Sequence, residues 1–275
     1  MLLGELMPEP LTFLYIKPDY DEDSIKYLVL TEPVRDYAQK IGYQVIDLEG
    51  EYAKPEYIYS AIEQYDPYIV FGSGHGCTHL MTAQDYMDTF WATPGCGEHP
   101  KYDNSLDMLS GRVTFLLSCY CGANLIPSIV ANGGVAGVGF SDEFTWVVDT
   151  DYTPTEDPFA LSFYDPPNYF MSLILDGVSV AEAHNKTKAR YDLLIATWKK
   201  WITDNQSAHP ADASRAYLAL SLLEHDKSIL TSIGEGFNLE SETVQGSSFL
   251  LLGTAMLGAI LLNYWIKSQP SSSSG

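Results

Sequence analysis

The chain has 275 residues, of which 46% are hydrophobic, and its 36 acidic and 15 basic residues give a formal net charge of −21. This length and composition suit one large α/β domain or two small ones with an ample core. So acidic a surface would repel phosphates, which excludes nucleic acid as the expected partner. The four cysteines, Cys77, Cys96, Cys119 and Cys121, are too few and too clustered for a disulfide framework, so we expect reduced thiols.

The first third of the chain alternates apolar, β-branched runs with helix-forming segments. After a short lead-in at 1–10, the expected elements are a strand at 11–16, a helix at 23–40 interrupted near Pro33, a strand at 43–48, a helix at 55–65 and a strand at 68–71. This β-α-β-α-β order predicts a parallel sheet with right-handed crossovers.

The remaining segments are read from the same signals. In chain order they are a connection at 77–111 with a helical middle at 83–90, a strand at 113–117, a helix at 125–131, a strand at 134–140, an exposed acidic loop at 141–157, two helices at 169–198 broken at Gly177, an apolar segment at 216–223 and a closing segment at 226–233. No internal repeat is found.

Two of the expected strands run directly into residues that can carry chemistry. The strand at 68–71 continues as FGSGHG, which places His75 between glycines, and the strand at 113–117 continues as SCYCG, which places Cys119 directly after a fully apolar run. The carboxyl ends of parallel strands share one edge of the sheet, so both residues are expected there. An imidazole can take the proton of a thiol, and the thiolate is a nucleophile. The alternative for Cys119 is an ordinary buried thiol.

These motifs resemble the signatures of the caspase-hemoglobinase superfamily of cysteine peptidases (clan CD), which includes caspases, metacaspases, gingipains, legumains and separases. FGSGHG is similar to the strand-then-His-Gly motif of the group, nearest to its metacaspase form, and LLSCYCG is similar to the strand-then-Cys-x-x-Gly motif. The segment at 177–189, GVSVAEAHNKTKA, resembles a late helix of gingipain-type domains. The resemblance implies a caspase-like three-layer α/β sandwich over 11–236, with a mostly parallel central sheet flanked by helices.

The resemblance also implies an activity, that of a cysteine endopeptidase acting on protein or peptide substrates through an acyl-enzyme. In this reading Cys119 is the nucleophile, His75 protonates the leaving amine and then activates water, and the backbone N–H groups of Gly76 and Cys119 hold the oxyanion. No cofactor is expected, and calcium activation is not indicated. Asp142 is a candidate floor for a pocket that selects Arg or Lys before the cleaved bond. The alternative is that Asp142 is simply a solvated acid.

The carboxyl-terminal part of the chain has a different composition. A linker at 237–248 precedes 18 uncharged residues at 249–266, which as a helix would span about 27 Å, close to the thickness of the hydrocarbon core. We therefore expect a single-pass membrane anchor, with a buried terminal helix as the alternative, and a disordered tail at 267–275. No amino-terminal signal is evident, which favours a tail anchor with the catalytic domain in the cytosol.

Two other functions remain open at this stage. One is a catalytically silent caspase-like domain that binds a partner peptide in the same groove. The other is a thiol- or metal-sensing α/β domain that uses His75 with Cys77, Cys119 and Cys121. The Cys-x-Cys spacing of the last two is less suited to chelation than Cys-x-x-Cys, which disfavours zinc.

Overall fold

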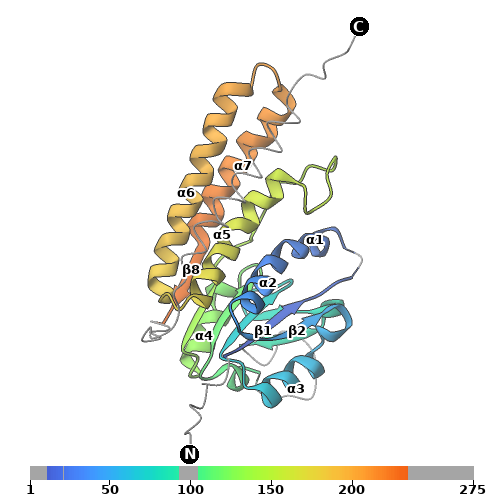
Figure 1. Cartoon of the computed structure of the whole chain (residues 1–275), viewed down its shortest axis with the longest axis vertical. Helices are drawn as coiled ribbons and strands as arrows, with labels where there is room; N and C mark the ends of the chain where they lie inside the picture. The colour runs from blue at the N-terminus through green and yellow to red at the C-terminus, as the bar shows by residue number, and fades with distance from the viewer. Residues whose placement is uncertain (1–10, 21, 93–104, 235–275) are drawn as a thin grey trace, which may run out of the picture.

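The computed structural model describes residues 11–20, 22–92 and 105–234 (Figure 1). The expected membrane segment at 249–266, its linker and tail, and Cys96 lie outside these ranges. Among the helices within them, none is both long enough and apolar enough to cross a membrane.

A six-stranded sheet forms the centre of the described part of the chain, with the strand order β2-β1-β3-β6-β7-β8. Its strands are β1 (Thr12–Lys17), β2 (Gln44–Glu49), β3 (Ile69–Ser73), β6 (Val113–Leu117), β7 (Ala136–Phe140) and β8 (Leu230–Ile233). All neighbouring pairs are parallel except β7 and β8, which are antiparallel. The expectation of a mostly parallel sheet is confirmed.

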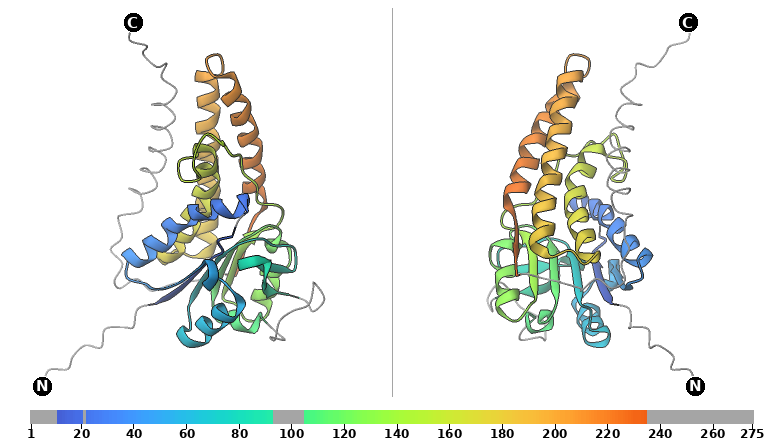
Figure 2. Two further views of the ribbon diagram at one scale, coloured as in Figure 1. Left: turned by 90° about the vertical axis from the view of Figure 1, so that its right-hand side faces the viewer. Right: turned by 60° about the vertical axis from the view of Figure 1, so that its left-hand side comes forward.

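Helices cover both faces of this sheet, which makes a three-layer sandwich (Figures 1 and 2). The helices are α1 (Asp23–Lys26), α2 (Glu32–Lys40), α3 (Pro55–Tyr65), α4 (Leu125–Ala131), α5 (Pro158–Leu175), α6 (Val180–Asn205) and α7 (Pro210–Ile229), with short 3₁₀ turns η1 (Tyr27–Thr31), η2 (Gly50–Tyr52), η3 (Gln84–Tyr86), η4 (Asp107–Leu109) and η5 (Cys121–Ala123). Successive strand residues point to opposite faces. Phe13 and Tyr15 therefore join the core beneath α2 and α5, whereas Leu14 and Ile16 join the core beneath α3 and α4.

The expected helix at 83–90 is wrong, because this segment is part of a β-hairpin. Strands β4 (Leu80–Thr82) and β5 (Asp88–Trp91) pair antiparallel around a turn in which Asp85 and Tyr86 have φ of 55° and 59°. The Gln84 side chain accepts from the Asp19 N–H at 2.8 Å and donates to the Asp19 carbonyl at 3.0 Å. This long-range clamp outweighs the local helix propensity.

The helices after β7 are longer than the sequence predicts. Helix α5 begins at Pro158 rather than near 169, because Asp157 caps it by accepting from the N–H groups of Phe159 (2.9 Å) and Ala160 (3.3 Å). The Pro166–Pro167 pair, a helix-breaking signal in the sequence, lies inside it. The expected break at Gly177 is confirmed, while α7 is one continuous helix that leads directly into β8.

Candidate active site

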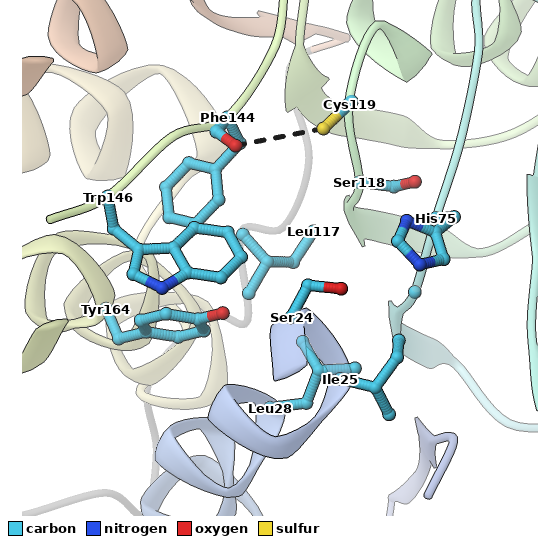
Figure 3. Close-up of a pocket in the computed structure, with 11 residues that line it drawn as sticks. Ser24, Ile25, Leu28, His75, Leu117, Ser118, Cys119, Phe144, Trp146 and Tyr164 are labelled. Atoms are coloured by element: carbon cyan, nitrogen blue, oxygen red, sulfur yellow. Dashed lines mark hydrogen bonds between the residues drawn. The ribbon is translucent and has the colours of Figure 1, made fainter. Parts of the chain in front are cut away.

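The pairing of β3 with β6 brings His75 and Cys119 to one place. The two strands are parallel neighbours, and Ser73 pairs with Leu117 at their carboxyl ends. His75 and Cys119 each follow two residues later, so both emerge at the same level of the sheet edge. Both line one pocket, which Figure 3 shows with Cys119 and His75 along one side of it. The expected proximity of the two residues is thus observed.

A sharp turn after β6 separates the two cysteines of the motif. Tyr120 has φ of 61°, a left-handed conformation that non-glycine residues adopt rarely, and its N–H donates to the Asp142 carbonyl at 3.0 Å. Cys119 is left half-buried at the pocket, with Sγ 3.8 Å from the Phe144 carbonyl oxygen. Cys121 points the other way, fully buried and 3.6 Å from the Leu80 carbonyl oxygen.

Two glycines of the motifs permit close approach of neighbouring segments. A Cβ at Gly76 would lie 2.2 Å from Ser118 Oγ and 2.9 Å from the Cys119 carbonyl oxygen, so a side chain there would collide with the turn at Cys119. A Cβ at Gly122 would lie 2.3 Å from Thr231 Oγ1 on β8. The glycines that the sequence motifs contain are therefore explained by packing between the loops.

A carboxylate that the sequence analysis missed holds the histidine. Glu22, in the loop after β1, lies with a carboxylate oxygen 3.0 Å from His75 Nε2. The same carboxylate accepts from Ser24 Oγ at 2.5 Å and from the Tyr86 hydroxyl. Tyr86 also stacks on His75, with ring centroids 5.4 Å apart and planes inclined by 5°. The imidazole is thus fixed by one hydrogen bond at its edge and one ring on its face.

The hydrogen bonds to Glu22 determine its ionisation. Partial burial raises the pKa of this carboxyl, but hydrogen bonds from Ser24, Tyr86 and His75 outweigh burial and lower it to about 2. Glu22 is therefore a carboxylate across the physiological range. The sequence offered no signal that selects it, because it stands in a run of acids, DYDED, at 19–23.

For the two thiols of the motif, burial outweighs the hydrogen bonds. It raises the pKa of Cys119, and the negative charge of the nearby Glu143 adds to this effect. Burial raises the pKa of Cys121 to about 12. At neutral pH both residues are thiols, and only Cys119 reaches the pocket.

The carboxyl end of α7 fixes the loop at 141–146, which forms a wall of the pocket. Asp226 Oδ1 accepts from the Thr145 N–H at 3.3 Å, and His225 Nε2 lies 3.1 Å from the Glu143 carbonyl oxygen. The Ser141 N–H donates to the last carbonyl of α7, that of Ile229, at 2.8 Å. Contacts with three residues of α7 therefore fix the position of this loop.

Asp142 is not in the position that the sequence analysis expected. Its side chain is exposed, it accepts from the Glu143 N–H at 2.8 Å, and it is not among the residues that line the pocket. The expected carboxylate floor is thus not formed by Asp142. Cys77, Cys119 and Cys121 are unbridged, and among the described residues no group of three or more His, Cys, Asp or Glu side chains is arranged to hold a metal ion.

Fold and site together define a three-layer α/β protein with a cysteine and a histidine in one pocket at the carboxyl edge of its sheet. No protein-family model matches the sequence, and no curated protein matches it. Among solved structures, the chain is similar to one described as the crystal structure of the Arg-specific cysteine proteinase gingipain R, with a TM-score of 0.49 and 12% sequence identity over 82% of this chain and 46% of that chain. The chain thus spans less than half of that protein's length. The function proposed for it rests on its own site residues.

Proposed function

We propose that this chain is a cysteine endopeptidase, a hydrolase that cleaves peptide bonds with Cys119 as nucleophile and His75 as general base and acid. The observation that carries the proposal is that both residues line one pocket, two residues beyond a paired position of adjacent strands, while an ionised carboxylate holds the imidazole. A nucleophile, a base and a group that orients the base form the arrangement that covalent catalysis requires.

Glu22 sets which nitrogen of His75 takes part. Because Nε2 donates to the Glu22 carboxylate, Nδ1 is the nitrogen that remains to exchange a proton with Cys119 and the leaving group. Glu22 remains ionised and so stabilises the imidazolium that forms when the thiol loses its proton. A positioning role for Tyr86, stacked on the ring, follows from the same geometry.

The reaction then proceeds in two stages. In the first, the Cys119 proton passes to His75 Nδ1, Sγ bonds to the carbonyl carbon, and the imidazolium returns the proton to the departing amine, which leaves a thioester. In the second, His75 takes a proton from water, and the hydroxide releases the acid and the thiol. The backbone N–H groups of Gly76 and Cys119 bind the oxyanion. Neither donates to a carbonyl or side-chain oxygen of the described residues, so both are available.

Active-site labelling of the full-length chain tests this proposal. Peptide acyloxymethyl ketones alkylate a cysteine only when it acts as the nucleophile, and peptide mapping of the adduct should identify Cys119. The Cys119→Ala variant should lose all cleavage of fluorogenic peptides, and the matched Cys121→Ala variant should retain much of it because Cys121 is turned away from the pocket. Equal loss in both variants, or labelling that persists in His75→Ala, would contradict the assignment.

A further inference from the structure

The pocket beside Cys119 has walls that are mostly apolar and aromatic. One wall is formed by Phe144 and Trp146 from the loop after β7 and Tyr164 from α5, whose rings contact one another with centroids 5.6–5.8 Å apart. The aliphatic side chains of Ile25 and Leu28 also line the pocket. Figure 3 shows the aromatic rings on one side of the pocket, Cys119 and His75 on the side across from them, and the aliphatic side chains below.

The pocket begins at the nucleophile itself. The Phe144 carbonyl oxygen, which belongs to the aromatic wall, lies 3.8 Å from Cys119 Sγ. The cavity is small, about 40 Å³ or room for about three water molecules, and it is partly open to solvent. A side chain next to the bond that Cys119 would attack can place its end in this space, while the rest of it stays at the open mouth of the pocket.

The acids around the pocket do not make it negatively charged inside. Apart from the Cys119 thiol and the Tyr164 phenol, His75 is the only ionisable side chain among the described residues that line the pocket. Glu22 lies beyond His75 and already accepts hydrogen bonds from three side chains, and Asp142 and Glu143 are exposed to solvent outside the pocket. Asp226 lies behind the wall, fully buried, and burial raises its pKa well above the ordinary value, which favours its neutral form.

We propose that this pocket receives the side chain that precedes the cleaved bond and that it selects apolar and aromatic residues over basic or acidic ones. The inference rests on the proposed peptidase function. An aliphatic or aromatic side chain gains by leaving water for these walls, and it can stack against Phe144 or Trp146. An arginine or aspartate would lose its hydration there without meeting an opposite charge.

Fluorogenic peptides that differ only at the residue before the cleaved bond test this inference with the full-length chain. The set contains Leu, Phe, Ala, Arg, Lys, Asp and Asn at that position, and kcat/KM is measured for each. We expect the Leu and Phe peptides to exceed the Arg, Lys, Asp and Asn peptides at least tenfold. Trp146→Ala should lower the Leu-to-Ala ratio several-fold, whereas the conservative Trp146→Phe should keep most of it. Tyr217→Ala, which removes an exposed aromatic residue that does not line the pocket, should leave the ratio unchanged.

The outcomes separate this inference from the function on which it rests. A preference for Arg, Lys, Asp or Asn, or equal cleavage of all peptides, would overturn the apolar selectivity while the peptidase proposal stands. Cleavage of none of the peptides, together with no labelling of Cys119 by any peptide acyloxymethyl ketone, would overturn both. Unaltered ratios in Trp146→Ala would show that another part of the surface receives this side chain and would also overturn the inference.

Discussion

Replacing Asp226 by asparagine should stabilise the protein increasingly as pH rises. Asp226 lies on α7 with no exposed surface; Thr145 donates to its Oδ1, and its Oδ2 has no hydrogen-bond partner among the described residues. Burial raises the pKa of this carboxyl, and the hydrogen bonds with Thr145 offset burial only in part. The side chain also interacts electrostatically with Cys119, Tyr164 and Tyr191, none of which supplies positive charge.

The sign and size of the effect follow from proton linkage. The folded protein keeps the Asp226 proton above the ordinary carboxyl pKa, whereas the unfolded chain releases it there. Unfolding therefore releases a proton, and the contribution of Asp226 to stability is complete below the unfolded pKa and is lost as pH rises toward the folded pKa. The loss is at most about 1.4 kcal/mol per pH unit, or roughly 2.7 kcal/mol between pH 5 and 7. An asparagine side chain at this position cannot ionise, so the Asp226→Asn variant lacks this loss.

Urea unfolding followed by tryptophan fluorescence at several values from pH 5 to 8 measures the effect. The free energy of unfolding of Asp226→Asn minus that of the wild type should grow with pH at a slope approaching the linkage limit. Glu224→Gln is the matched control, since Glu224 is an exposed acid on the same helix whose ion pair with Lys199 faces solvent, and its difference should stay flat. A flat difference for Asp226→Asn as well would mean that Asp226 is ionised in the fold, and the reasoning would be refuted.

Three further predictions concern the site. Gly76→Ala should reduce stability by about 1–3 kcal/mol and slow labelling of Cys119, because the added Cβ would meet Ser118 Oγ at 2.2 Å; Ser118→Ala should recover part of the loss in urea unfolding. Glu22→Gln should lower kcat/KM by about 10–100-fold with little change in KM, since general acid–base catalysis contributes about 10²–10⁴-fold and only the orientation and charge support of His75 are lost. Alkylation of Cys119 by iodoacetamide should keep accelerating above the usual thiol range, because burial raises its pKa; a rate that levels off near neutral pH would contradict this.

The strand ends could be predicted from the sequence because the information is local. The apolar runs before His75 and Cys119 mark buried strands, and parallel strands deliver their following residues to one edge. Only the register of Ser73 with Leu117, which the structure supplies, shows that the two residues emerge level with each other. The structure likewise explains why Gly76 and Gly122 are glycines, because neighbouring atoms leave no space for a Cβ at either position.

The elements that the sequence did not predict depend on contacts between distant segments. The hairpin at 80–91 contains a helix-like sequence, but Gln84 binds the backbone of Asp19, 65 residues earlier in the chain. Glu22 is one of several neighbouring acids, and it reaches His75 only because β1 lies beside β3 in the sheet. Asp142 was favoured by its position after β7, yet the chain turns so that Phe144 and Trp146, rather than the carboxylate, line the pocket.

Two parts of the fold thus contribute different residues to the site. The segments after β1 and β3 supply Glu22 and His75, while the turn at Cys119 and the aromatic wall pack against the carboxyl-terminal part of the domain. Gly122 packs against Thr231 on β8, and Asp226 on α7 holds Thr145 between the two wall residues. A change in α7 can therefore shift the wall of the pocket without touching His75 or Cys119, because contacts from α7 position the wall. Burying Asp226 there, at a pH-dependent cost in stability, keeps the wall in place without putting a negative charge behind it.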